Sequence, residues 1–108
     1  MNTLFVVDDE RAFADFVVKV ATTAGYEATA CDSVVALRRE MEGGWPSVLV
    51  LDLQMPETDG IELLRELGEQ RCPSKVVLIS GMDERVLDAA YRLGSEFRLV
   101  MAGAARQP

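Results

Sequence analysis

The sequence contains no histidine, and only two of its 108 residues are cysteines. The absence of histidine excludes Ser-His and Cys-His nucleophilic catalysis, histidine general bases and histidine-ligated zinc. Cys31 and Cys72 are too few and too far apart for a metal site or a disulfide framework, so we expect both to be reduced, partly buried thiols. Any chemistry must therefore use carboxylates, hydroxyls, backbone groups or a basic side chain.

Basic residues and long apolar runs are also scarce. The chain has 11 Lys and Arg residues against 18 Asp and Glu residues, a net charge of −7. Because phosphate contacts need clustered basic side chains, we expect no direct nucleic-acid binding. No apolar run approaches the roughly 18 residues of a membrane span, and the N-terminus lacks a charged-then-apolar leader. We therefore expect a cytoplasmic protein without membrane association, whose acidic surface suits a divalent cation or a basic partner.

Short apolar runs alternate with segments of helical spacing along the whole chain. A chain of this length is expected to form one domain, residues 1–108. Four stretches carry apolar residues at helical spacing, and they lie between five runs that are typical of strands. The predicted strands are Thr3–Val7, Tyr26–Cys31, Val48–Leu51, Lys75–Ser80 and Phe97–Met101. Repeated strand–helix units of this length predict an α/β fold, with a parallel sheet and helices on both faces.

Several helix boundaries are marked by polar residues and glycine. Asp8 or Asp9 is the predicted N-cap of the first helix, and Asp83 that of the fourth, which starts at Glu84. Gly94 is expected to end the fourth helix after Leu93. The pair Asp59-Gly60 is expected to shape a loop and to start the third helix.

Polar side chains follow three of the predicted strands. Asp8 and Asp9 follow the first strand, Asp52 the third, and Ser80 ends the fourth. In a parallel sheet these ends meet at one edge, where three carboxylates would repel one another. Either one carboxyl stays protonated, or a hard cation bridges them. Carboxylates with a loop carbonyl and waters are the ligands that Mg²⁺ prefers, so we favour the metal.

A metal-bound carboxylate beside a hydroxyl indicates phosphoryl chemistry. Asp52, at the tip of the central strand, could act as a nucleophile toward phosphorus, while the metal neutralises the phosphoryl oxygens. Ser80 would donate a hydrogen bond to one of those oxygens. The product would be an aspartyl phosphate.

Three motifs together resemble the receiver domains of two-component response regulators over essentially the whole chain. They are Val6-Val7-Asp8-Asp9-Glu10, Asp52-Leu53-Gln54-Met55-Pro56-Glu57-Thr58-Asp59-Gly60 and Ile79-Ser80-Gly81. The resemblance implies a three-layer, flavodoxin-like, doubly wound parallel sheet of five strands in the order 2-1-3-4-5. It also implies site roles: Asp52 as phosphoacceptor, Asp8 and Asp9 as the acidic pair for Mg²⁺, the Gln54 backbone carbonyl as a further ligand, and Ser80 as the switching hydroxyl.

The chain departs from the family pattern near its C-terminus. Receiver domains carry a lysine after the fifth strand, usually followed by proline, and no lysine follows Lys75 here. Either Gln107 or Met101 stands at that position, and Gln107 is favoured because Pro108 follows it. Arg98 and Arg106 are the cations that could substitute. The sequence also stops before the family's fifth helix, which suggests a truncated domain, an unusual end or a partner that covers the sheet.

Three functions are compatible with these residues. The first is a phosphoacceptor receiver domain that takes a phosphoryl group from a histidine kinase or phosphotransfer protein, acts with an output domain or a homodimer partner, and catalyses only its own phosphorylation and dephosphorylation. The second is a non-switching interaction module that keeps the fold without the lysine. The third, a metal-dependent phosphatase, is disfavoured because such enzymes need a second carboxylate where Gln54 stands. Gln54 and Met82 are also expected to flank the site and to control access of water.

Overall fold

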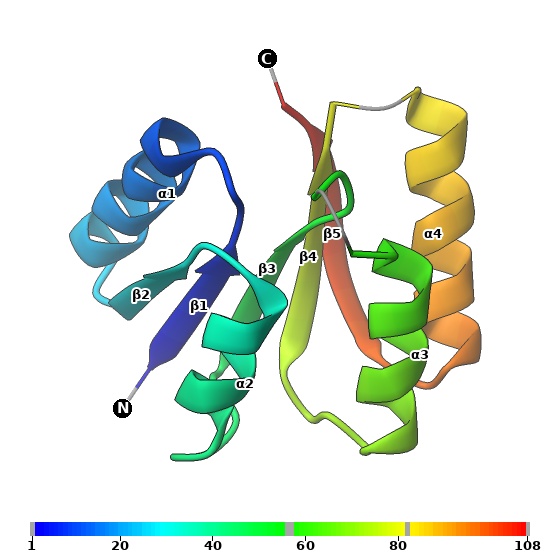
Figure 1. The fold of residues 1–108 in the computed structure, drawn as a ribbon, viewed down its shortest axis with the longest axis horizontal. Helices are drawn as coiled ribbons and strands as arrows, with labels where there is room; N and C mark the ends of the chain where they lie inside the picture. The colour runs from blue at the N-terminus through cyan, green and yellow to red at the C-terminus, as the bar shows by residue number, and fades with distance from the viewer. Residues whose placement is uncertain (1, 56–57, 82, 108) are drawn as a thin grey trace.

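The structure, a computed structural model, describes residues 2–55, 58–81 and 83–107. Strands and helices alternate along the chain from the first strand to the fifth (Figure 1). The strands are β1 (Thr3–Val7), β2 (Glu27–Cys31), β3 (Val48–Asp52), β4 (Lys75–Ser80) and β5 (Val100–Arg106). The helices are α1 (Arg11–Thr23), α2 (Val34–Met41), α3 (Gly60–Glu69) and α4 (Glu84–Glu96).

All strand pairs are parallel, and the order across the sheet is β2-β1-β3-β4-β5. This confirms the flavodoxin-like doubly wound fold. The central strands are aliphatic on both faces, and Leu49, Val50 and Leu51 of β3 are all buried. No fifth helix follows β5 within the described residues.

Two apolar cores hold the three layers together. Leu4, Val6, Val50 and Ile79 pack with α1 on one face of the sheet. The other face packs against α2, α3 and α4 through a larger core. This core includes Leu37 of α2, Leu64 of α3 and Leu87 of α4. The loops that follow the strands all emerge at one edge of this frame.

The two cysteines lie where the sequence placed them, inside the fold. Cys31 ends β2 and Cys72 precedes β4, and both are free, buried thiols. Burial raises the pKa of the Cys31 thiol to about 11, with Glu40 and Asp32 adding to the effect. A thiol with so high a pKa is a poor nucleophile at neutral pH, which fits a structural role.

The predicted end of α4 and the predicted bounds of β5 are wrong. The helix continues through Gly94 to Glu96. Gly94 does not end the helix but gives room for Met101, since a Cβ at position 94 would lie 2.5 Å from the Met101 sulfur. Phe97 caps the helix, and Arg98 adopts a positive φ of 67°, so this segment turns before the strand begins. β5 then runs from Val100 to Arg106.

Other predicted boundaries agree with the structure. Asp59 caps α3 by accepting hydrogen bonds from the backbone of Ile61 and Glu62, and Asp83 caps α4 by accepting one from Arg85. No helix in the described part of the chain combines the length and the apolarity that crossing a bilayer requires.

Candidate functional site: an acidic cluster at the carboxyl edge of the sheet

Strand register brings the predicted site residues to one edge of the sheet. Val7 pairs with Leu51 and Asp52 pairs with Ile79, so Asp8 and Ser80 lie beside the end of β3. Figure 1 shows these strand ends meeting at the upper edge of the sheet. In open α/β sheets this carboxyl edge is where ligands bind.

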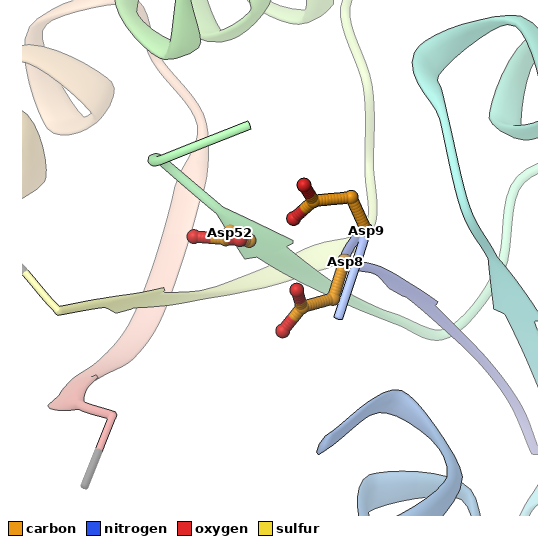
Figure 2. A group of neighbouring side chains, drawn as sticks. All are labelled: Asp8, Asp9 and Asp52. Carbon is orange, nitrogen blue, oxygen red and sulfur yellow. The ribbon is translucent and has the colours of Figure 1, made fainter. Parts of the chain in front are cut away.

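Asp8, Asp9 and Asp52 form a compact cluster. Carboxylate oxygens of the three residues all lie within 4.8 Å of one another (Figure 2). Asp8 and Asp52 are almost fully buried, with exposed fractions of 1% and 4%, whereas Asp9 is exposed. The cluster therefore has two carboxylates fixed in the protein and a third open to solvent.

Hydrogen bonds hold the two buried carboxylates in place. Asp8 Oδ1 accepts the backbone N–H of Glu10 at 2.9 Å, and Asp52 Oδ1 accepts that of Gln54 at 2.9 Å. The prediction that Asp8 or Asp9 caps α1 is wrong, because Glu10 is the N-cap and its side chain makes no capping bond. The Asp8 carboxyl instead accepts the N–H of the N-cap residue itself, one position before the first turn of α1.

The environment of Asp52 disfavours its charged form. Burial raises the pKa of its carboxyl from 3.8 to about 6; the Gln54 N–H opposes this rise, while Asp8 and Asp9 add to it. Carboxylates this close either retain a proton or bind a cation. The donor set consists of oxygen atoms only, which is the set that Mg²⁺ and Ca²⁺ select. The residues present therefore fit a hard divalent cation.

No basic side chain among the described residues forms an ion pair with the cluster. In the described part of the chain, none of the ion pairs involves Asp8, Asp9 or Asp52. Arg98 lies before the start of β5, at the opposite end of the sheet, and the charge of Arg106 acts on Asp83. Neither arginine takes the position of the family lysine.

Gln107, rather than Met101, reaches the acidic cluster. Its side-chain Nε2 donates to Asp8 Oδ2 at 2.7 Å, and its backbone N–H donates to the carbonyl of Ser80 at 2.8 Å. Met101 packs near Gly94, and its carbonyl accepts the Tyr91 hydroxyl at 2.9 Å. A neutral amide therefore lies against a carboxylate of the cluster. Pro108, which favoured this alignment, lies outside the described residues.

Ser80, at the end of β4, and Gln54, in the loop after β3, flank Asp52. Ser80 is fully buried at the end of β4. The Gln54 side-chain Oε1 accepts the backbone N–H of Gly81 at 3.0 Å and so links the loops after β3 and β4. Nothing in the sequence pointed to this bond; it needs the bare Gly81, where a Cβ would lie 2.9 Å from that oxygen. The predicted contribution of Met82 lies outside the described residues.

The sequence and the fold are both similar to those of known proteins. Residues 4–97 match the model of the response regulator receiver domain. A protein-glutamate methylesterase/protein-glutamine glutaminase 2 from Xanthomonas campestris is 41% identical over 83 residues, covering 74% of this chain. The transcriptional regulatory protein FixJ from Bradyrhizobium diazoefficiens is 31% identical over 93 residues, covering 85% of this chain. The chain spans 23% of the length of the first relative and 45% of the second.

A solved structure shares both the fold and some of the sequence. A response regulator from Colwellia psychrerythraea is 29% identical, has a TM-score of 0.79, and matches 99% of this chain and 85% of its own. The arrangement of strands and helices described above is therefore one that this group of proteins shares.

Proposed function

Because the chain belongs to the response regulator receiver domain family, we propose that it accepts a phosphoryl group on Asp52 in a two-component signalling system. The observation that carries this proposal is the cluster itself: Asp52 lies at the end of the central strand, with two further carboxylates within 4.8 Å. The chain spans only 23% of the methylesterase relative, so the activity in that relative's name is not carried over to it. We propose no reaction for it beyond its own phosphorylation and dephosphorylation.

The proposed donor is the phosphohistidine of a histidine kinase or phosphotransfer protein. An oxygen of the Asp52 carboxylate attacks phosphorus, the P–N bond breaks, and the imidazole nitrogen leaves with the electron pair and takes up a proton. Asp8, Asp9, Asp52 and the Gln54 backbone carbonyl would hold Mg²⁺, which supplies charge neutralisation at the phosphoryl oxygens. Ser80 would donate its hydroxyl proton to one of these oxygens.

The first expected result is a Mg²⁺-dependent gain of one phosphoryl group. Purified protein incubated with acetyl phosphate and Mg²⁺ should gain the mass of one phosphoryl group, as measured by intact-protein mass spectrometry. Excess EDTA should suppress the gain. A folded protein that gains no mass under any donor and metal condition would contradict the phosphoacceptor function.

A second function, a non-switching interaction module, is favoured by one observation: the contact at Asp8 comes from the neutral amide of Gln107. In the family the lysine at this position pairs with the phosphoryl group. Without a cation there, phosphorylation would be coupled less strongly to a shift of β5 and α4. If phosphorylation leaves the backbone amide spectrum of these elements unchanged, the module is the better description.

Gln107→Lys is expected to stabilise the Mg²⁺-free domain. Its ammonium group would lie among three carboxylates, and a hydrogen bond to a charged group contributes roughly 1.5–3 kcal/mol. Gln107→Met is the matched control, since it keeps a long side chain and loses both the donor and the charge. Urea unfolding in EDTA should rank the variants Lys, Gln, Met in falling stability. A Lys variant no more stable than the Met variant would show that residue 107 does not interact with the cluster.

The expectations for the domain and its partners stay predictions. These expectations are one domain over residues 1–108, an output domain and a homodimer partner. A histidine kinase or phosphotransfer protein as donor is part of the proposal above.

A further inference from the structure

A groove lies between α2 and α3, beside the acidic cluster. Its volume is about 580 Å³, within the roughly 300–1,000 Å³ of clefts that bind ligands, and it opens to solvent. α3 packs on α4 and α2 packs on β1 and β2, so the two helices that border the groove are each supported from the other side. The two helices lie on the same face of the sheet in Figure 1.

The groove has an apolar lining. Val34 and Val35 line it from the first turn of α2, and Leu63 lines it from α3. Met55, in the loop after β3, lines it near the acidic cluster. Val35 is 57% exposed, which makes it one of the large apolar side chains that the fold leaves uncovered. An exposed valine inside a groove, rather than alone on a convex surface, gives an apolar partner something to bury.

Most of the remaining lining residues are acidic. Five carboxylates line the groove: Asp9, Asp32, Asp59, Glu62 and Glu66. Its single basic lining residue, Arg38, is already bound by Glu66, with its Nη2 at 3.0 and 2.9 Å from the two carboxylate oxygens. Among the described residues Asp32 has no hydrogen bond or ion pair of its own. Glu62 is likewise bound by Arg65, whose Nη2 lies 2.6 Å from Glu62 Oε1. Among the described residues, the lining carboxylates outside any ion pair are Asp9, Asp32 and Asp59, and they carry the excess negative charge beside the apolar strip.

We propose that this groove binds an amphipathic helix of a partner protein, with Lys or Arg residues flanking an apolar stripe. The apolar stripe would cover Val35 and Leu63. The basic flanks would face Asp9, Asp32 and Asp59, which lie just before α1, α2 and α3. This is the arrangement by which amphipathic helices bind grooves. Nucleic acid is excluded by the negative charge. The binding does not depend on phosphorylation, so it can be tested apart from the proposed phosphoacceptor function.

The test uses a synthetic helical peptide of Leu and Lys, about 14 residues long so that it can form a helix. Its affinity for the unphosphorylated protein is measured by fluorescence anisotropy in EDTA at physiological ionic strength. Backbone amide shifts then locate the peptide on the protein. We expect saturable binding, with the largest shifts in the facing residues of α2 and α3.

Val35→Asp separates apolar docking from simple charge attraction. The substitution adds a negative charge, so pure electrostatic attraction to a cationic peptide predicts tighter binding. Docking in the groove predicts binding weaker by about tenfold, because the peptide no longer buries a valine side chain at position 35. An acidic residue in the first turn of α2 also favours the helix, so the fold should be kept. Val86→Asp is the matched control: Val86 is 47% exposed in the first turn of α4, and its loss should not weaken binding.

Three results would overturn the proposal. Val35→Asp could leave the affinity unchanged or raise it, which would make the attraction purely electrostatic. The amide shifts could centre on α1 or α4. The free protein could self-associate with shifts at the same α2 and α3 residues, which would make a second copy of this chain the occupant.

Discussion

Asp52→Asn is expected to stabilise the unphosphorylated, Mg²⁺-free domain by up to about 3 kcal/mol at neutral pH. In the folded protein, burial and the neighbouring carboxylates raise the pKa of Asp52 from 3.8 to about 6. Ionised Asp52 therefore costs free energy that an amide does not. Asn keeps an oxygen that can accept the Gln54 N–H, so the local hydrogen bond is retained. The gain would be a large part of the stability of a domain of this size.

The stability gain of Asp52→Asn is expected to depend on pH. The folded state binds the Asp52 proton more tightly than the unfolded state, so the contribution of Asp52 to stability falls as pH rises from about 4 to about 6 and then levels off. The advantage of Asn should therefore be largest above about pH 6 and should disappear near pH 4. Urea unfolding in EDTA across this range measures it. Asp88→Asn, at an exposed position on α4, should show no comparable gain. An Asn variant less stable than the parent at neutral pH would contradict the account of the cluster.

Removal of Mg²⁺ is expected to slow phosphorylation of Asp52 by roughly 100-fold, because charge neutralisation by a metal contributes several kcal/mol to such transfers. Asp9→Asn should raise the Mg²⁺ concentration needed for half-maximal rate by at least about tenfold. Asp9 is the informative ligand to change, because it is exposed and its side chain makes no hydrogen bond or ion pair among the described residues. Its replacement should therefore leave the fold intact.

A binding measurement separates the effect of Asp9→Asn on Mg²⁺ affinity from its effect on the phosphorylation rate. Thermal unfolding with increasing Mg²⁺ reports metal affinity without phosphorylation, since a ligand of the native state raises the unfolding temperature. The parent should be stabilised at Mg²⁺ concentrations where Asp9→Asn is not. Asp88→Asn again serves as the charge-matched control. Equal stabilisation of the parent and Asp9→Asn by Mg²⁺ would remove Asp9 from the set of metal ligands.

Much of the frame was predictable because its signals are local. Leu4–Val7 and Val76–Ile79 are uninterrupted apolar runs. The strands predicted around them, Thr3–Val7 and Lys75–Ser80, coincide with β1 and β4. Asp52 follows four aliphatic residues, and parallel topology then brings it beside Asp8. The convergence of the acidic residues thus follows from strand pattern and topology.

The C-terminal part was not predictable, because its determinants are tertiary. The sequence Ala-Gly-Ala-Ala in β5 has weak strand propensity, and the strand is held by pairing with β4 and by packing on α4. The hydrogen bonds of Gln107 to Asp8 and of Gln54 to Gly81 join residues far apart in the chain. The alignment with the family lysine placed Gln107 at the site, but no sequence pattern specifies either hydrogen bond.

The most direct test is to locate the phosphoryl group chemically. An aspartyl phosphate is an acyl phosphate, which borohydride reduces to homoserine, so peptide mapping after reduction identifies the modified residue. Protein treated with acetyl phosphate and Mg²⁺ should yield homoserine at position 52 and keep aspartate at positions 8 and 9. Homoserine at another position, or none in protein that has gained a phosphoryl group, would contradict Asp52 as the phosphoacceptor.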